Sequence, residues 1–457
     1  MVRKPVTTEE VVAQEPTTIL DAEPPKDFAA DFNPKTLWGK LGPGLITGAA
    51  DDDPSGIGTY SVAGAQFGYA TLWLSLIAYP CAVAVQEVSA RIGIMTGHGL
   101  AAIIKKHYGK GILAVLTLLL FGANTINVGA DLQAMSSTVT MLNPSLPYTA
   151  VAVGFAILTL ILLIALPYRI YCRFLKYTTI TLFAYVLVAF AAHADWGSAI
   201  RNLIVPTISS DPIYIMALVG ILGTTISPYM FFWQANEEVE EEISKGYIRK
   251  DGPETLHHTL LKVGPKLLRD MRIDVGVGML YSQVIMFFII AAAGSTLYTS
   301  GISSSVANLT LPQLASVLQP LVGDTAYLLF SLGIIGTGML AIPVLAGSAS
   351  YAVSELFGWQ EGLNKKFHEA KGFYVVIILS TVIGLFLNDL GVSPVSALFY
   401  TAILNGLVAV PMIYMIWRIG NNKKILGENT NGLLSNIVIV FTLLLMTGAA
   451  VAMFALM

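Results

Sequence analysis

Three consecutive aspartates, Asp51, Asp52 and Asp53, lie inside an apolar stretch that is long enough to enter a membrane. A charged side chain at bilayer depth costs roughly 2.5 kcal/mol or more, so such residues mark ion or substrate paths. Pro54 follows directly and cannot continue the ladder of backbone hydrogen bonds, so we expect the helix to break here. Carboxylates and freed backbone carbonyls are the ligands of hard cations. The stretch therefore predicts a site for a hard divalent cation, with Asp53 as its central ligand.

A second break is predicted at Thr224–Pro228, within another apolar segment. Thr224 and Ser227 are three residues apart, which predicts that they share one face of a half-helix and point at the ion. Packing by small hydroxyl residues is the alternative explanation for both. Ser55 and Thr225 would add hydroxyl groups around them. Two interrupted spans at corresponding places in two halves of a chain point to the substrate site of a secondary transporter.

Each remaining candidate has a structural alternative. Asp53 could cap the second half-helix. Asp51 and Asp52 cannot both face the cavity, so one or both could line the access path or cap the neighbouring half-helix instead of binding the ion directly. Asp131, in another apolar span, is either an ion-path residue or a satisfied structural acid. Gln86 fits a polar bridge between helices better than a ligand. Tyr229 could line the pocket or hydrogen-bond across the two broken helices.

Composition places these residues in a polytopic all-α membrane protein. The 457 residues are 55% hydrophobic and only 12% charged, with a mean hydropathy of +0.69, whereas soluble domains carry about 25% charged residues. The two cysteines, Cys81 and Cys172, are too few for a disulfide framework. The basic residues are spread along one side of the membrane rather than clustered, so nucleic-acid binding has no support.

Apolar runs of about 20 residues predict eleven membrane spans. With the N-terminus in the cytoplasm, only Arg201 of the 26 lysines and arginines falls outside, as the positive-inside rule requires. We therefore expect a multi-pass protein of the cell membrane with an extracellular C-terminus. The predicted spans are 42–66, 70–92, 112–137, 148–168, 176–194, 211–237, 273–298, 324–350, 372–388, 393–417 and 432–456.

The spans divide into two groups of five that begin on opposite sides of the membrane. An odd number of spans inverts the second group, so the two broken helices should run antiparallel at the midplane. The expected organisation is a disordered cytoplasmic tail (1–40), a first repeat (41–195), a second repeat (196–420) with a cytoplasmic loop (238–272), and a peripheral eleventh span (421–457).

Several stretches resemble the natural-resistance-associated macrophage protein family of divalent-metal transporters. The resemblance implies a LeuT-like fold, an inverted repeat of five plus five spans with spans 1 and 6 broken, working by alternating access. The end of span 2 is the most specific match, because it is long and ungapped. The matching stretches are Asp53–Gly56, Gln86–Ala101, Asp131–Ala134, Ser227–Tyr229 and Phe330–Glu355.

Departures from the family pattern point to its distant prokaryotic branch of magnesium transporters. Gly56, Ser227 and Tyr229 stand where the family has Asn, Met and His, and Ala134 replaces a Glu. A thioether is a soft ligand that favours transition metals, so Ser227 leaves only hard donors. Gly56 should enlarge the cavity. A wide oxygen-lined pocket suits largely hydrated Mg²⁺ and also Mn²⁺, whereas Ca²⁺ prefers six to eight ligands.

Proton coupling is not favoured, because none of the six histidines falls at bilayer depth. Uniport down the membrane potential would supply roughly 4.6 kcal/mol for a divalent ion at about 100 mV. The alternatives are a proton-coupled Mn²⁺ or Fe²⁺ importer of the same family and a sodium-coupled amino-acid symporter. We expect no enzymatic activity and no cofactor, a monomer in the lipid bilayer, and the metal ion as substrate.

Overall fold

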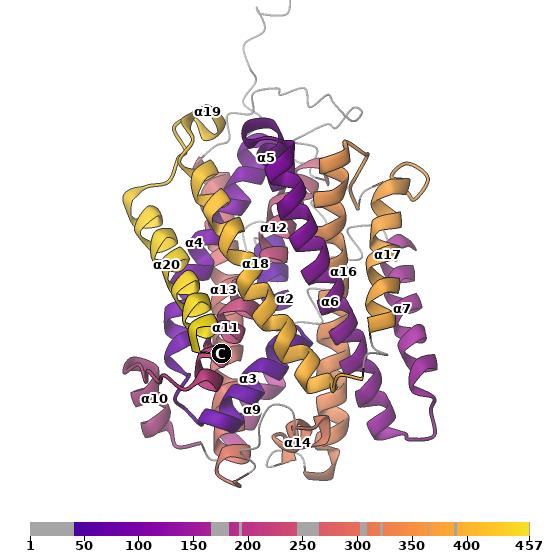
Figure 1. Ribbon diagram of the computed structural model, residues 1–457, viewed down its shortest axis with the longest axis vertical. Helices are drawn as coiled ribbons and strands as arrows, with labels where there is room; N and C mark the ends of the chain where they lie inside the picture. The colour runs from indigo at the N-terminus through magenta and orange to yellow at the C-terminus, as the bar shows by residue number, and fades with distance from the viewer. Residues whose placement is uncertain are drawn as a thin grey trace, which may run out of the picture.

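The computed structural model describes residues 41–165, 182–191, 194–244, 265–301, 309–319, 323–363, 365–387 and 391–456, and these residues form helices and turns without a β-strand. The predicted tail, 1–40, lies outside the described residues. So does part of the predicted fifth span, whose described portion is helix α9 (Phe183–Ala191). Figure 1 shows the helices gathered into one elongated bundle.

Each predicted span contains a helix, and eight helical segments are long and apolar enough to cross a membrane. One of these eight is the pair α11–α12 counted together, and α17 (Lys371–Leu387) is shorter. The helix α13 ends in a π-helical turn, η3 (Gly294–Tyr298), and a 3₁₀ turn, η5 (Gly323–Thr325), precedes α16. The unbroken long helices are α4 (Trp73–Thr96), α6 (Lys110–Leu142), α7 (Tyr148–Ala165), α13 (Pro265–Ala293), α16 (Ala326–Phe357), α18 (Pro394–Gly420) and α20 (Leu433–Leu456).

The segment predicted as a cytoplasmic loop, 238–272, overlaps a helix at each end. Helix α12 (Pro228–Ser244) extends into its start, and α13 already begins at Pro265. The acidic residues at 237–242 are helical, and most of them are buried rather than solvated. Residues 245–264 lie outside the described part of the chain.

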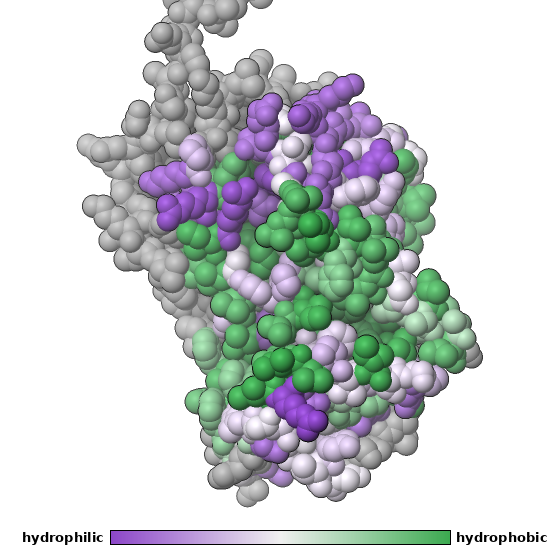
Figure 2. Space-filling model, turned by 90° about the vertical axis from the view of Figure 1, so that its left-hand side faces the viewer, coloured by the Kyte–Doolittle hydropathy of each residue, from purple (hydrophilic) through white to green (hydrophobic). Residues whose placement is uncertain are grey.

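The surface carries a broad apolar band between two more polar ends, and Figure 2 shows this band in green on one face. Leu118 of α6 is 72% exposed, Phe386 of α17 is 67% exposed and Leu444 of α20 is 66% exposed. Exposed apolar surface of this extent marks contact with lipid rather than water. The short helices α5 (Leu100–Tyr108) and α19 (Lys423–Leu426) lie at one end, and α10 (Trp196–Ile204) and α14 (Leu311–Ser316) lie at the other (Figure 1).

Both predicted breaks are present. Helix α2 (Pro43–Asp51) is separated from α3 (Pro54–Phe67) by Asp52 and Asp53 alone, and α11 (Pro212–Thr225) is separated from α12 by Ile226 and Ser227. Pro54 and Pro228 each start the second half, where a missing N–H costs nothing. Helix α2 packs against α12, and α3 packs against α11. This crosswise pairing means that the two broken helices run antiparallel, as their positions in the sequence predict.

The first half-helix is held by α13. Asp274 accepts hydrogen bonds from the backbone N–H groups of Gly42 at 2.9 Å, Gly44 at 2.7 Å and Leu45 at 3.1 Å, so it satisfies the free donors at the start of α2. A Cβ at Gly44 would lie only 2.6 Å from the backbone nitrogen of Val275. The close approach of α2 to α13 therefore requires glycine.

Candidate functional site

Asp53 caps the start of α3 and is fully buried. One oxygen of its carboxylate accepts hydrogen bonds from the Ser55 hydroxyl and the Gly56 amide, both at 2.6 Å. The other accepts from the Asn127 side chain of α6 at 3.2 Å. The capping role is therefore present, and a carboxylate held by three donors remains an acceptor with lone pairs to spare. Capping and ion ligation are compatible at this residue.

Three further carboxylates surround Asp53, and all are completely buried. Asp51 accepts a hydrogen bond from Ser282 of α13, while its second oxygen has no hydrogen-bond partner in the described part of the chain. Neither oxygen of Asp52 has a hydrogen-bond partner among the described residues. Neither oxygen of Asp131 forms a well-aligned hydrogen bond with a described residue, although the Ser55 amide lies near it. Asp51, Asp52 and Asp131 each interact electrostatically with Asp53, so the four acids form one group.

No basic side chain balances this acidic group within the described part of the chain. Arg91 is the one buried basic residue there. It bonds to Asn431 at 2.6 Å and pairs with Glu87 at 3.2 Å, so it belongs to a different network. Buried charges are normally paired or bound to a metal. A group of buried acids without a counter-charge therefore requires a cation or protons.

The second break contributes Thr224, whose buried hydroxyl has no partner among the described residues. It lies beside Gly56, where an added Cβ would be 3.2 Å from the Thr224 hydroxyl oxygen and 2.8 Å from the Asp51 carbonyl oxygen. The structure therefore brings Asp53, Gly56 and Thr224 together. It also corrects the expectation that Gly56 enlarges a cavity, because Gly56 instead lets two broken helices touch.

Ser227 does not share a half-helix face with Thr224, because α11 ends at Thr225 and Ser227 lies in the break itself. Its hydroxyl donates back to the carbonyls of Gly223 at 2.5 Å and Thr224 at 2.8 Å. Thr225 likewise bonds to the Ile221 carbonyl at 2.6 Å. The prediction that Thr224 and Ser227 share one helical face is therefore wrong, whereas Ser227 as an ion ligand stays a prediction, because its oxygen lies at the break.

Two tyrosines tie the broken helices to each other. The Tyr229 hydroxyl of α12 donates to the Ala50 carbonyl of α2 at 2.8 Å. The Tyr60 hydroxyl of α3 lies 3.2 Å from the Thr225 hydroxyl of α11. The structure thus contains the bond across the breaks that the sequence left open for Tyr229. Both tyrosines are fully buried, so their hydroxyl groups lie inside the protein between the two breaks.

Gln86 is buried in α4, and neither atom of its amide has a partner among the described residues. No bridge between helices is therefore seen there. Asn127 and Ser282 contact the acids directly but were not singled out from the sequence. A signal for Asn127 existed, because Asn124, Asn127 and Asp131 follow helical spacing along an otherwise apolar span. Ser282 gave no comparable signal.

The donors at the two breaks are carboxylates, hydroxyls and carbonyls. The described residues contain no group of three or more His, Cys, Asp or Glu side chains arranged to enclose a metal ion. A soft atom lies close by, since the Met286 sulfur is 3.8 Å from the Thr225 hydroxyl oxygen. The site therefore offers several separate hard ligands, with one thioether behind the second break.

The antiparallel broken helices and the buried oxygen donors between them define the LeuT-like class of helical membrane transporters. The fold neighbours agree with this assignment. A manganese transporter of Eremococcus coleocola aligns with a TM-score of 0.69 and 16% identity, covering 91% of this chain and 86% of that one. Mhp1, a nucleobase-cation-symport-1 family transporter in a closed conformation, aligns with a TM-score of 0.53 and 13% identity, covering 91% and 93%.

The chain belongs to the natural resistance-associated macrophage protein-like family, whose model matches residues 44–456. The resemblance identified from the sequence is thus confirmed at the level of the family. Among its relatives is the divalent metal cation transporter MntH of Mycobacterium tuberculosis, 24% identical over 71% of this chain and 72% of that protein. MntH of Listeria monocytogenes is 25% identical over 66% and 65%. These relatives are transporters rather than enzymes.

Proposed function

We propose that this protein carries Mg²⁺, and also Mn²⁺, into the cell by alternating access, with the ion bound between the two broken helices. The observation that carries the proposal is the group of four buried acids, Asp51, Asp52, Asp53 and Asp131, without a buried basic partner in the described part of the chain. The names of the relatives, divalent metal cation and manganese transporters, support a divalent cation as substrate.

The argument for magnesium is the hardness and sparseness of the ligands. Asp53 accepts from the Gly56 amide, and the Thr224 hydroxyl and the Asp51 carbonyl both lie close to the same glycine. Mg²⁺ keeps several waters and is usually bound through one or two carboxylates, so few protein ligands suffice. Ca²⁺ would need more oxygens than this arrangement supplies. Ser55 positions Asp53 through its hydrogen bond. Thr225 and Tyr229 instead link the two broken helices through theirs, so we assign none of the three as a direct ligand.

We further propose that transport is not coupled to protons, and that the N-terminus is cytoplasmic. His98, His107 and His368, the described histidines, all lie outside the long helices. The alternative is a proton-coupled Mn²⁺ or Fe²⁺ importer. Two observations favour it: adjacent buried acids can share a proton, and the Met286 sulfur lies behind the second break. The two candidates differ in a measurable way.

The deciding experiment is uptake into liposomes that contain the purified protein, with Mg²⁺, Mn²⁺ and Ca²⁺ at matched concentrations. We expect uptake of Mg²⁺ and Mn²⁺, much weaker uptake of Ca²⁺, and no change in internal pH. A pH-sensitive dye inside the vesicles reports coupling in the same preparation. Acidification that tracks Mn²⁺ entry would contradict uncoupled transport. Uptake of Mn²⁺ without uptake of Mg²⁺ would contradict the proposal that Mg²⁺ is a substrate.

The effect of position 227 on metal selectivity can be tested by placing a soft donor there. Ser227→Met is expected to raise the ratio of Mn²⁺ to Mg²⁺ uptake by about tenfold, because a thioether favours transition metals. Ser435→Met, on the peripheral helix α20, is the matched control and should leave the ratio unchanged. An unaltered ratio in a folded Ser227→Met protein would show that this position does not set selectivity.

A further inference from the structure

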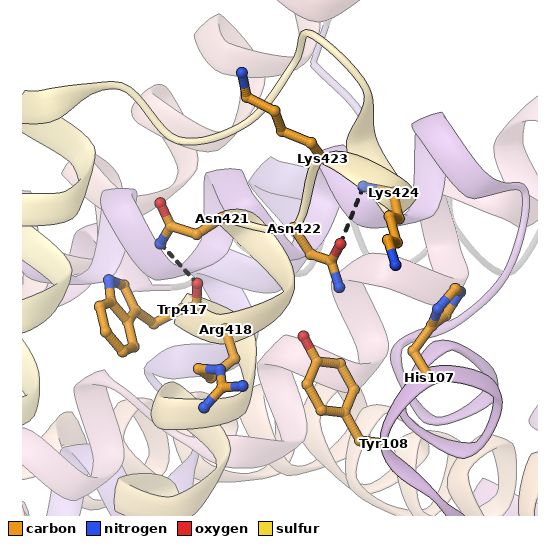
Figure 3. A pocket seen from close by; sticks show the side chains of 8 residues that line it. All are labelled: His107, Tyr108, Trp417, Arg418, Asn421, Asn422, Lys423 and Lys424. Carbon is orange, nitrogen blue, oxygen red and sulfur yellow. Dashed lines mark hydrogen bonds between the residues drawn. The ribbon is translucent and has the colours of Figure 1, made fainter.

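A basic cavity lies at the end of the bundle that carries α5 and α19, away from the broken helices. Its volume is about 720 Å³. The ends of α5 and α18, helix α19 and the turn between the last two form its walls. Figure 3 shows the lining side chains, with the Lys423 chain extending outward. The lining residues are His107, Tyr108, Trp417, Arg418, Asn421, Asn422, Lys423 and Lys424.

The charge of the cavity is positive, because Arg418, Lys423 and Lys424 line it and no acidic side chain does. The pKa of His107 is lowered by partial burial and by neighbouring Lys106, so this histidine is mostly neutral at pH 7. Three permanent positive charges remain around a space large enough for a phosphate with its attached glycerol. Such a cavity is complementary to a phosphate group.

The walls are held in place by hydrogen bonds. The Arg418 guanidinium bonds to the Tyr414 hydroxyl at 3.0 Å and lies over the Tyr108 ring at 6.0 Å. Behind it, the Asn436 side chain accepts from Trp417 at 3.1 Å and from Asn421 at 2.8 Å. These contacts hold the end of α18 and the turn after it against α20, which fixes one side of the cavity.

The cavity also borders the apolar band. Tyr414 lies one helical turn deeper in α18 than Arg418 and is 41% exposed. Tyr108 and Trp417 are aromatic residues of the kind that gather at the membrane–water interface. A molecule with a phosphate head and apolar chains could therefore place its head among the three cations and its chains along the exposed surface beside Tyr414.

We propose that this cavity binds the headgroup of an anionic phospholipid from the surrounding leaflet. Basic pockets between helix ends at a membrane surface suit such headgroups, and each nearby Lys or Arg adds to the attraction. The assignment does not depend on which metal ion the protein carries. The proposed lipid site is formed only by the C-terminal ends of α5 and α18, the turn after α18 and helix α19.

The test uses the full-length purified protein and native mass spectrometry with added phosphatidylglycerol or phosphatidylcholine. We expect phosphatidylglycerol to bind at least about tenfold more tightly than phosphatidylcholine. The variant Arg418→Gln/Lys423→Gln/Lys424→Gln should lose that preference. The matched control is Lys365→Gln/Lys366→Gln/Lys371→Gln, which removes the same charge near the start of α17 and should keep it.

Two results would overturn the proposal. One is an unchanged lipid preference in the cavity variant. The other is displacement of phosphatidylglycerol from the wild-type protein by millimolar inorganic phosphate, which would make the cavity a site for soluble phosphate. If the triple variant does not fold, Lys423→Gln/Lys424→Gln serves instead, because both lysines are exposed on the short helix α19.

Discussion

Asp53→Asn is expected to abolish divalent cation uptake while leaving the protein folded. Asparagine is as good an N-cap as aspartate, so it can still accept from Ser55 and Gly56 and start α3. It removes the charge, however, and a lost buried charge partner costs about 3 kcal/mol or more. Uptake should therefore fall by at least about 100-fold. The measurement is Mg²⁺ and Mn²⁺ influx into liposomes, with size-exclusion chromatography and circular dichroism to confirm folding.

The chain offers a matched control for this prediction. Asp211 caps the start of α11 and accepts from the Ile213 amide at 2.8 Å, but it is exposed. Asp211→Asn makes the same chemical change at the other broken helix and should leave uptake within about twofold. Asp53→Ala should lose both uptake and some stability, because the cap is also removed. Wild-type uptake by a folded Asp53→Asn protein would exclude Asp53 as an ion ligand.

The breaks in the two helices could be predicted because their causes are local. Pro54 and Pro228 interrupt the backbone ladder whatever surrounds them, and buried acids beside a proline are costly without a role. Their antiparallel arrangement followed from the number of spans between them. The side-chain partners could not be predicted in this way, because Asn127 and Ser282 reach the acids only through the packing of α6 and α13.

Gly56 and Ser227 show the limit of the sequence most clearly. The lack of a side chain at Gly56 predicts empty space, whereas the end of helix α2 occupies that space. The spacing of three residues between Thr224 and Ser227 predicts that both lie on one helical face. The break between them changes the direction of the chain, so they do not. Helical spacing holds only within one helix, so it fails at the interruptions where this site is formed.

Gly56→Ala should therefore impair transport more than the size of one methyl group suggests. The new Cβ would lie 2.8 Å from the Asp51 carbonyl oxygen, which is backbone and cannot turn aside, and 3.2 Å from the Thr224 hydroxyl oxygen. Overpacking of this kind costs about 1–3 kcal/mol, and the cost falls on the arrangement in which the start of α3 lies against the end of α2 and the Thr224 side chain of α11. We expect uptake to fall about 10- to 100-fold.

Gly122→Ala is the matched control, because Gly122 is also helical and a Cβ there would meet nothing within 4 Å. That change should be neutral or slightly stabilising. The distinguishing measurement is the concentration dependence of Mg²⁺ uptake, since disturbed ligands should weaken apparent affinity as well as maximal rate. Normal uptake by Gly56→Ala would mean that the two breaks separate enough during transport to accommodate the methyl group. The contact at Gly56 would then not limit the transport cycle.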